Sequence, residues 1–314
     1  MRKKLYLEPF VLILFALVLG GNPTSAQSVF FLNKKFEVGL NIGPSNFLGD
    51  LGGNFGRGKT FLKDNNVELT KVLTGAYIAY FPAEWIGIRF SGQKTVLEGD
   101  DKVIDRKGSW EERRSDRNLS FRSPLLEGYL AAEFYPTVFF EYDDYLEKKL
   151  RPFIVAGVGM FKFKPQAQLN GQWVDLQPLH LEGQGFPEYP DRKNYKLTQV
   201  CFPVGLGVKY YVTETFSVGL EAIHRFTRTD YIDDVSTRYI DPALFNRYLA
   251  PDKAAQAIQL NDRRLVNFGT IGRRRGDPSE NDSYYSIALK LNWRLGNPDA
   301  SEWRKARRQV RCYH

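Results

Sequence analysis

The stretch GGNFGRGKT, residues 52–60, has the spacing G-x-x-x-x-G-K-[ST] of a phosphate-binding loop, through Gly53, Gly58, Lys59 and Thr60. Such a loop cradles phosphate only where a strand precedes it and a helix follows, because N–H groups at the helix N-terminus supply the contacts. The following segment, FLKDNNVE, shows no amphipathic helical pattern. We therefore predict no nucleotide site and interpret the stretch as a flexible, basic loop.

A second candidate group lies in HRFTRTDYIDDVS, where His224 precedes Asp230, Asp233 and Asp234. A histidine beside carboxylates could act as a general base in hydrolysis or acyl transfer. The sequence offers no specific serine or cysteine partner, so we predict no catalytic site and no enzyme. With Asp241, the same acids could hold calcium, but they lack the alternating spacing and central glycine of a calcium loop. We predict neither a metal nor a cofactor.

The first residues have the pattern of an export signal. Arg2, Lys3 and Lys4 precede the apolar run FVLILFALVLG, and the small residues Thr24–Ala26 follow it. The run is much shorter than the ~20 residues that span a bilayer, so we predict a signal peptide, residues 1–26, cleaved after Ala26. No cysteine follows the cleavage site, which argues against a lipoprotein.

The charge of the mature chain is mild. Removing residues 1–26 takes three basic residues and one acid from 44 Lys+Arg and 36 Asp+Glu, which leaves a net charge of +6. Both signs are spread along the chain, so we predict no nucleic-acid partner. Cys201 and Cys312 lie far apart and do not make a disulfide framework.

Stretches of about ten residues with alternating polarity recur through the chain, and such a period of two is typical of strands with two different faces. The last stretch is the clearest: Tyr285, Ile287, Leu289, Leu291, Trp293 and Leu295 share one face and Tyr284, Ser286, Ala288, Lys290, Asn292 and Arg294 the other. Residues 36–42 and 199–210 repeat the pattern. Five further strands are expected at about 73–81, 86–96, 125–135, 151–164 and 216–226.

The predicted connections alternate in length. Short ones follow the second, fourth and sixth strands, and long ones lie at about 44–71, 97–123, 165–197 and 227–281. Within the last loop, PALFNRYLAP and DKAAQAIQLND indicate two short helices separated by Pro251. An even strand count with short turns at one end and long loops at the other predicts an all-β fold: an eight-stranded antiparallel up-and-down transmembrane β-barrel with long outer loops.

A secreted β-sandwich or lipocalin-like barrel is the soluble alternative, because it also alternates. Aromatic residues near the strand ends favour the membrane barrel, where they form interfacial girdles. The predicted girdle comprises Phe36, Trp85, Phe90, Phe134, Tyr135, Phe153, Phe163, Tyr210, Phe216, Phe226, Tyr285 and Trp293. For the strand at 151–164 we expect Phe153, Val155, Phe161 and Phe163 to face outward, because the other register points Lys162 and Lys164 at lipid.

The inward positions carry charges of both signs, for which we predict a structural network inside the barrel. Its members are Glu37, Arg89, Glu127, Glu133, Lys162, Lys209, Glu221, Arg225, Lys290 and Arg294. Eight strands leave room only for side chains or one small ligand, so we expect an ion-paired plug. A narrow anion-selective path is the alternative, because basic residues outnumber acids at the inward positions, which also include Lys164.

Several segments resemble the PorG-like outer-membrane β-barrel family of Bacteroidota: FEVGLNIGPSNFLGDLGG, RNLSFRSPLLEGYLAAEFYP, RPFIVAGVGMFKFKP, FTRTDYIDDVSTRYIDPALF and RGDPSENDSYYSIALKLNWRLG. The resemblance implies a component of the type IX secretion system, which exports proteins and in some species supports gliding. It also implies a position above a periplasmic ring of PorK-like and PorN-like subunits, and it supplies no catalytic residue. Relatives outside the secretion machinery share the resemblance.

We thus predict three parts: the signal peptide, an outer-membrane barrel over residues 27–298 in contact with lipid, and a basic periplasmic tail, residues 299–314. The tail could dock on a periplasmic partner through Arg304, Lys305, Arg307, Arg308 and Arg311, or be a solubilising end. The predicted function is structural anchoring of the secretion machinery. The alternative is a small OmpA/OmpW-like barrel that forms a solute channel or binds a ligand.

Overall fold

The computed structural model describes residues 36–51, 67–103, 116–139, 149–213, 215–264 and 271–295. The predicted signal peptide, the GGNFGRGKT stretch and the basic tail lie outside the described residues. Residues Glu37–Trp293 form one unit, and the terminal segments Met1–Phe36 and Arg294–His314 form a second.

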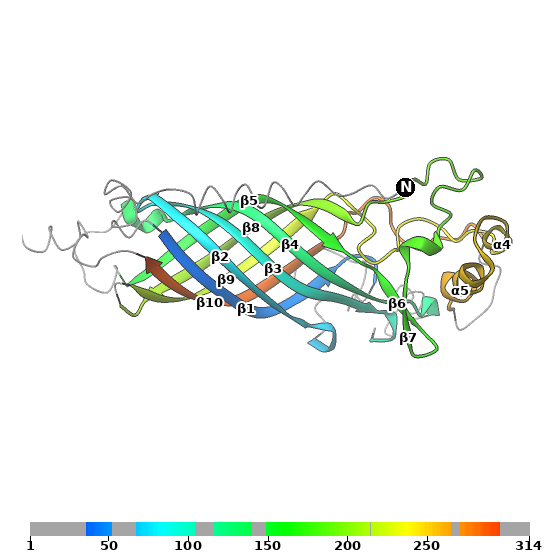
Figure 1. Ribbon diagram of the computed structural model, residues 1–314, viewed down its shortest axis with the longest axis horizontal. Helices are drawn as coiled ribbons and strands as arrows, with labels where there is room; N and C mark the ends of the chain where they lie inside the picture. Colours follow the sequence, from blue (N-terminus) through cyan, green and yellow to red (C-terminus); the bar gives the residue numbers. More distant parts are fainter. Residues whose placement is uncertain are drawn as a thin grey trace, which may run out of the picture. The chain divides into compact units, whose positions relative to one another are not determined.

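Eight long strands close into an antiparallel barrel (Figure 1), and the predicted fold is confirmed. The strands are β1 (Phe36–Leu48), β2 (Lys71–Ala83), β3 (Ile86–Asp100), β4 (Ser120–Phe134), β5 (Leu150–Phe163), β8 (Thr198–Tyr211), β9 (Phe216–Thr227) and β10 (Ser283–Leu295). Each strand pairs with its neighbours along the chain, and β1 pairs with β10 to complete the ring. Closure leaves no long strand edge exposed. A barrel in a membrane requires this closure, because an open edge would leave backbone groups without hydrogen bonds in lipid.

The alternation of short and long connections is also confirmed. Glu84 and Trp85 alone join β2 to β3, and residues 212–215 join β8 to β9, whereas residues 228–282 join β9 to β10. We call the two ends of the barrel the turn end and the loop end. Strands β3 and β4 run several residues further toward the loop end than predicted, because their ladder continues to Asp100 and Ser120.

The register of β5 corrects the prediction. Phe153, Val155, Phe161 and Phe163 are buried inside the barrel, whereas Lys162 and Lys164 are exposed. The outward apolar band of β5 consists of Ile154, Val158 and Met160, and the two lysines come after this band, at the loop end. Lys164 pairs there with Asp175 at 2.8 Å. A lysine costs several kcal/mol only near the bilayer midplane and little near its edge, so it does not fix the register.

The aromatic girdle is present in part. At the turn end, Trp85, Phe134 and Phe139 contact one another with ring centroids 5.9 to 6.2 Å apart. Phe216 and Trp293 lie 5.3 Å apart at the same end. Tyr135, like Phe153 and Phe163, faces the interior instead and is wrongly assigned to the girdle.

The long connections fold into a loop layer, which we define as residues 49–51, 101–103, 116–119, 164–197 and 228–282 where described. It contains the hairpin β6 (Gln166–Leu169) and β7 (Gln172–Asp175) and the helices α4 (Ala243–Tyr248) and α5 (Pro251–Asn261), all at the loop end (Figure 1). Both predicted short helices are thus confirmed, and Pro251 begins the second, where its missing N–H costs nothing. No described helix is long and apolar enough to cross a membrane.

The loop layer has its own apolar core. The core residues are Ala167, Leu176, Leu179, Leu181, Phe186, Ile240, Phe245, Ala254, Ala257 and Leu260. Four short 3-10 helices complete the described elements: η1 (Val67–Leu69), η2 (Asp101–Val103), η3 (Pro136–Phe139) and η4 (Gln177–Leu179). Because α5 and η4 contribute to one core, the β5–β8 and β9–β10 connections pack as a single layer.

Candidate functional site

The interior of the barrel holds a network of buried charges. Eight inward side chains, each at most 4% exposed, belong to it: Glu37, Arg89, Glu127, Glu133, Lys209, Glu221, Arg225 and Lys290. They occupy inward positions of six of the eight barrel strands, because successive strand residues alternate between lipid and lumen. All eight were among the residues selected from the sequence.

Glu133 is the centre of this network. Its carboxylate accepts a 2.7 Å hydrogen bond from Nη1 of Arg89 and lies 3.5 Å from Nζ of Lys290 and 3.8 Å from Nζ of Lys209. Arg89 and Lys290 also contact the Glu221 carboxylate, at 2.6 and 3.1 Å. Two carboxylates and three cations therefore form one connected cluster.

Glu37 extends the cluster at the turn-end part of the lumen. It accepts a 2.7 Å hydrogen bond from Nζ of Lys209 and a 2.9 Å hydrogen bond from the hydroxyl of Tyr77. Lys209 also lies 5.2 Å from the ring centre of Phe81, and Lys290 lies 4.2 Å from that of Tyr77. Cation–π contacts of this kind help to compensate the lost hydration of a buried ammonium group.

A second ion pair lies nearer the loop end. Nε of Arg225 is 3.0 Å from Oε2 of Glu127, and Nη1 of Arg225 donates to the hydroxyl of Ser286 at 2.8 Å. Glu127 also accepts from the side chains of Gln93 and Cys201. Packed polar side chains therefore continue toward the loop end.

The network is electrically balanced. Its four glutamates face two arginines and two lysines, and the further buried Arg151 at the turn end lies 3.7 Å from the exposed Glu84. With Lys162 and Lys164 on the outside, most of the excess of basic residues that suggested an anion path is removed. Arg294, near the end of β10, is half-buried, and its place in the network stays a prediction.

The loop layer contains a second buried charged group, which the sequence did not reveal as a unit. Arg117 pairs with Asp101 at 2.8 Å and also donates to the carbonyl oxygens of Arg275 and Asp50. Arg275 in turn pairs with Glu182 at 3.0 Å. These contacts tie together the connections that follow β1, β3, β5 and β9.

Glu182 organises the segment after β9. Its two carboxylate oxygens accept hydrogen bonds from the backbone N–H groups of Ser236 and Thr237, at 2.9 and 2.8 Å. Nearby, Asp234 accepts a 2.6 Å hydrogen bond from the hydroxyl of Tyr195. Burial raises the pKa of Asp234 to about 7, although Arg275 and this hydrogen bond act in the opposite direction.

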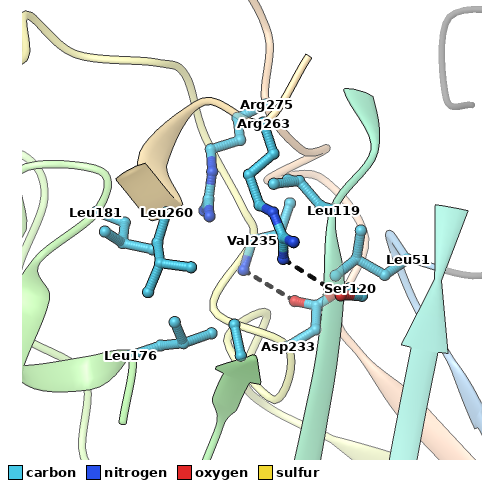
Figure 2. Close-up of a pocket in the computed structure, with 11 residues that line it drawn as sticks. Leu51, Leu119, Ser120, Leu176, Leu181, Asp233, Val235, Leu260, Arg263 and Arg275 are labelled. Atoms are coloured by element: carbon cyan, nitrogen blue, oxygen red, sulfur yellow. Dashed lines mark hydrogen bonds between the residues drawn. The ribbon is translucent and has the colours of Figure 1, made fainter. Parts of the chain in front are cut away.

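A small pocket lies where the barrel mouth meets the loop layer. Figure 2 shows Leu51 and Leu119 on one side and Leu176, Leu181 and Leu260 on the other. Asp233, Arg263 and Arg275 also line it, and the backbone N–H of Val235 donates to Asp233 (Figure 2). The enclosed space holds about one water molecule, too little for an organic ligand.

Sequence comparison identifies the family. The family described as Domain of unknown function (DUF6089) matches residues 24–241, which is more than half of the 314 residues. The chain belongs to this family. A search of curated proteins gave no match.

Solved structures of small barrels resemble this DUF6089 chain only distantly. The Neisserial surface protein A (NspA) shows 9% identity with a TM-score of 0.36, over 83% of this chain and 97% of the other. The N-terminal barrel domain of Pseudomonas aeruginosa OprF shows 10% identity, a TM-score of 0.31 and coverage of 82% and 97%. OprG of the same organism shows 10% identity, a TM-score of 0.31 and coverage of 84% and 99%. The fold assignment rests on the strand pairing of the chain itself.

Three segments of this DUF6089 chain that carried the PorG-like resemblance converge in the loop layer. They are LGD, residues 48–50, at the end of β1, TDYIDDVS, residues 229–236, after β9, and RGDPSENDS, residues 275–283, which leads into β10. Asp50 accepts a hydrogen bond from the N–H of Asp277 at 2.7 Å, and Asp282 accepts one from the N–H of Ile232 at 2.8 Å. The sequence analysis does not predict that Asp50, Asp282 and Glu182 lie together. The only indication in the sequence is that several segments of the PorG-like resemblance contain aspartates.

The catalytic group considered from the sequence is not assembled. His224 lies on the outward face of β9, beside Phe226 at 4.4 Å between ring centres, whereas Asp230, Asp233 and Asp234 are buried in the loop layer. Asp241 lies two residues before the start of α4 and accepts a hydrogen bond from the N–H of Ala243. Among the described residues, no three His, Cys, Asp or Glu side chains are arranged to hold a metal ion.

Proposed function

We propose that this chain is an outer-membrane β-barrel that acts as a non-enzymatic anchoring component of the type IX secretion machinery. The observation that carries the membrane location is the apolar exterior of the barrel. Every barrel strand exposes large apolar side chains, among them Leu40, Ile78, Phe90, Leu130, Val158, Leu206, Leu220 and Leu289. A soluble protein rarely exposes an apolar patch of more than a few hundred Å².

These side chains are also neighbours around the ring. Phe90 pairs with Leu130, and Leu130 pairs with Val158 on the next strand. Their side chains are 58%, 52% and 51% exposed. A continuous apolar band is unfavourable in water, because removing apolar surface from water stabilises a protein by about 25 cal/mol per Å². Contact with lipid tails removes this surface from water.

The membrane location is tested in two steps. The native chain is expected in the outer-membrane fraction, and the folded barrel in detergent should migrate differently on a gel before and after boiling. A chain found in the soluble fraction, with a mobility that never changes on heating, would contradict the proposal.

The filled lumen supports anchoring over transport. Its charges are paired with one another, and an eight-stranded barrel has no space left once such side chains fill it. Reconstitution into planar bilayers distinguishes the alternative, a narrow solute channel or ligand-binding barrel. Absent conductance agrees with the anchor, and steady single-channel conductance of the purified chain favours the channel.

Membership of the secretion machinery is supported by the PorG-like segments, and the proposed partner is a periplasmic ring of PorK-like and PorN-like subunits. The basic tail, residues 299–314, is the proposed contact with this ring. Deletion of the gene in its host should cause unprocessed cargo with a C-terminal signal to accumulate. Complementation with the full chain should restore processing, and the chain lacking residues 299–314 should restore less and lose the ring in a pull-down. Normal cargo processing after deletion would refute the secretion role but not the barrel fold.

A further inference from the structure

The loop layer buries far more acid than base. Six of its carboxylate side chains are at most 8% exposed: Asp101, Glu182, Asp230, Asp233, Asp234 and Asp282. Among the described residues of the layer, Arg117 and Arg275 are the buried cations. The charge network inside the barrel, by contrast, has equal numbers of acids and cations. Because a buried charge without a partner costs several kcal/mol, this excess requires an explanation.

The two arginines are already paired. Arg117 donates to Asp101 through Nε and Nη2, both at 2.8 Å, and Arg275 donates to Glu182. No described lysine or arginine forms an ion pair with Asp230, Asp233 or Asp282. These three carboxyl groups therefore lack a cation within 4 Å in the part of the chain that the structure describes.

Each of these carboxyl groups also has an oxygen with no hydrogen-bond partner. The oxygens are Oδ2 of Asp230, Oδ2 of Asp233 and Oδ1 of Asp282, all shielded from solvent. In Asp233 and Asp282 the other oxygen accepts a backbone N–H, from Val235 at 2.9 Å and from Ile232 at 2.8 Å. An ionised carboxylate needs hydrogen-bond donors for both of its oxygens, whereas a neutral carboxylic acid carries a proton on one of them. A buried oxygen without a donor therefore fits the protonated form better than the ion.

The carboxyl groups lie close enough to influence one another. A side-chain carbon on Gly49 would collide with Oδ1 of Asp282, so Asp282 packs against the residue before Asp50. The pKa of Asp230 is raised to about 9, mainly by burial and next by the negative charge of the Asp50 carboxylate. Burial, followed by Asp233 and Asp230, raises the pKa of Asp282 well above its usual range.

We propose that Asp50, Asp230, Asp233 and Asp282 form a proton-binding cluster that closes the loop layer at mildly acidic pH and loosens it when the protons are lost. The acids come from three segments: the connection after β1, the segment after β9 and the segment before β10. Shared protons turn mutual repulsion into hydrogen bonding. Ionisation restores the repulsion, and the three segments separate.

Other charged groups face the cluster and set the pH range. Arg117, from the segment before β4, favours the ionised forms of Asp50 and Asp233, and Arg275 favours that of Asp233. Glu182, from the β5–β8 connection, acts in the opposite direction on Asp50 and Asp230. Burial raises the pKa of Asp50 to about 6, although its hydrogen bond from Asp277 lowers it.

The sign of the effect follows from these directions. An aspartate whose pKa is higher in the closed state binds more protons there than in the open state, whose pKa is about 4. Closure is therefore favoured fully below pH ~4 and is lost as the pH rises through the values of the closed state, about 6 for Asp50 and about 9 for Asp230. For each proton released, the ratio of open to closed layer rises up to about tenfold per pH unit.

Limited trypsin digestion of the full-length barrel in detergent tests the proposal, because Arg238, Lys253 and Arg274 lie in the layer. The rate is divided at each pH by that of an unstructured reference peptide, and EDTA is present. We expect this ratio to rise at least tenfold between pH 6 and pH 8. A ratio that stays constant between pH 5 and pH 9 would overturn the proposal.

Isosteric variants identify the groups. Asp282→Asn and Asp230→Asn imitate the protonated acids. Each should reduce the increase in normalised cleavage rate between pH 6 and pH 8 at least threefold. Asp277→Asn is the matched control, since Asp277 lies in the same loop but is partly exposed and pairs with Arg274. Its charge raises the pKa of Asp50 only, so this variant should keep the part of the pH response that comes from Asp230 and Asp282. Each variant is first checked for the heat-dependent gel shift of a folded barrel. If Asp277→Asn flattened the response as much as Asp282→Asn, the cluster would not be its source.

A cation is the competing explanation for the same acids, and the experiment separates the two. Digestion at pH 8 is repeated with calcium chloride in place of EDTA. The proton cluster predicts less than a twofold change in rate. Protection by calcium of tenfold or more, lost in Asp282→Asn, would overturn the proposal in favour of a metal site.

Discussion

Replacing Glu133 by glutamine should unfold the barrel more easily than any single change to a surface charge. Glu133 touches three cations, Arg89, Lys290 and Lys209, at 2.7, 3.5 and 3.8 Å. At an effective dielectric constant of about 20, opposite charges 4 Å apart attract by about 4 kcal/mol, so roughly 12 kcal/mol of attraction is lost. The neutral amide also avoids the desolvation cost of a carboxylate, which is several kcal/mol. We therefore expect a net loss of about 3–5 kcal/mol in the free energy of unfolding.

Urea unfolding of the barrel in detergent micelles or lipid vesicles, followed by tryptophan fluorescence, measures this loss. The control is Glu98→Gln, which removes an equally short 2.8 Å pair with Lys71, but on the surface, where both side chains are at least 22% exposed. That change should cost less than about 1 kcal/mol. The double variant Glu133→Gln with Lys290→Met restores the charge balance and should cost less than the sum of its single changes.

If Glu133→Gln cost no more than Glu98→Gln, the lumen would be hydrated enough to screen its charges. The network would then not be a desolvated plug, and a water-filled path through the barrel would regain support.

Three further predictions concern the register and the loops. Phe153→Ala should destabilise the barrel by about 3–5 kcal/mol and Ile154→Ala by much less in the same unfolding assay, because the first side chain is 2% and the second 52% exposed; equal losses would contradict the β5 register. Lys162 should react with a water-soluble amine reagent in the folded protein and Lys209 should not, as peptide mass spectrometry would show. Gly49→Ala should raise the trypsin cleavage rate of the loop layer at pH 6, because the added carbon collides with Asp282, while the gel shift of the barrel stays unchanged.

The barrel could be predicted from the sequence because its two faces have different chemistry. In β10, Ile287 and Leu289 point outward while Lys290 and Asn292 point inward, and no other arrangement hides the charges from lipid. Where the strands are this distinct, the inward positions follow directly from the alternation, and eight of the ten residues predicted for the network are buried inside the barrel.

Strand β5 shows where that reasoning fails. Its residues from Phe153 to Met160 are apolar or glycine on both faces, so alternation gives no direction. The prediction then depended on Lys162 and Lys164, which lie at the end of the strand, where the cost of a charge is small. Arg151, at the other end, favoured the correct register, because it faces inward.

The loop layer could not be assembled from the sequence, because its contacts join distant segments. Asp50 and Asp277 are 227 residues apart, and Glu182 and Ser236 are 54 apart. Strand periodicity carries no information about such contacts. The acids after β9 were noticed from their spacing alone, but the partners that bury them come from other connections.

The barrel interior and the loop layer should respond differently to pH, and the reason lies in where each can find a compensating charge. Lipid surrounds the lumen, so its glutamates, such as Glu133, must be neutralised by cations from neighbouring strands, and the structure provides these in equal number. The loop layer lies beyond the apolar band, where protons can reach it from water. Its acids, such as Asp282, therefore need no fixed cation to be buried. It follows that the unfolding midpoint of the barrel should vary little between pH 6 and pH 8 while the loop layer opens, and parallel changes in both would mean that the two parts do not titrate separately.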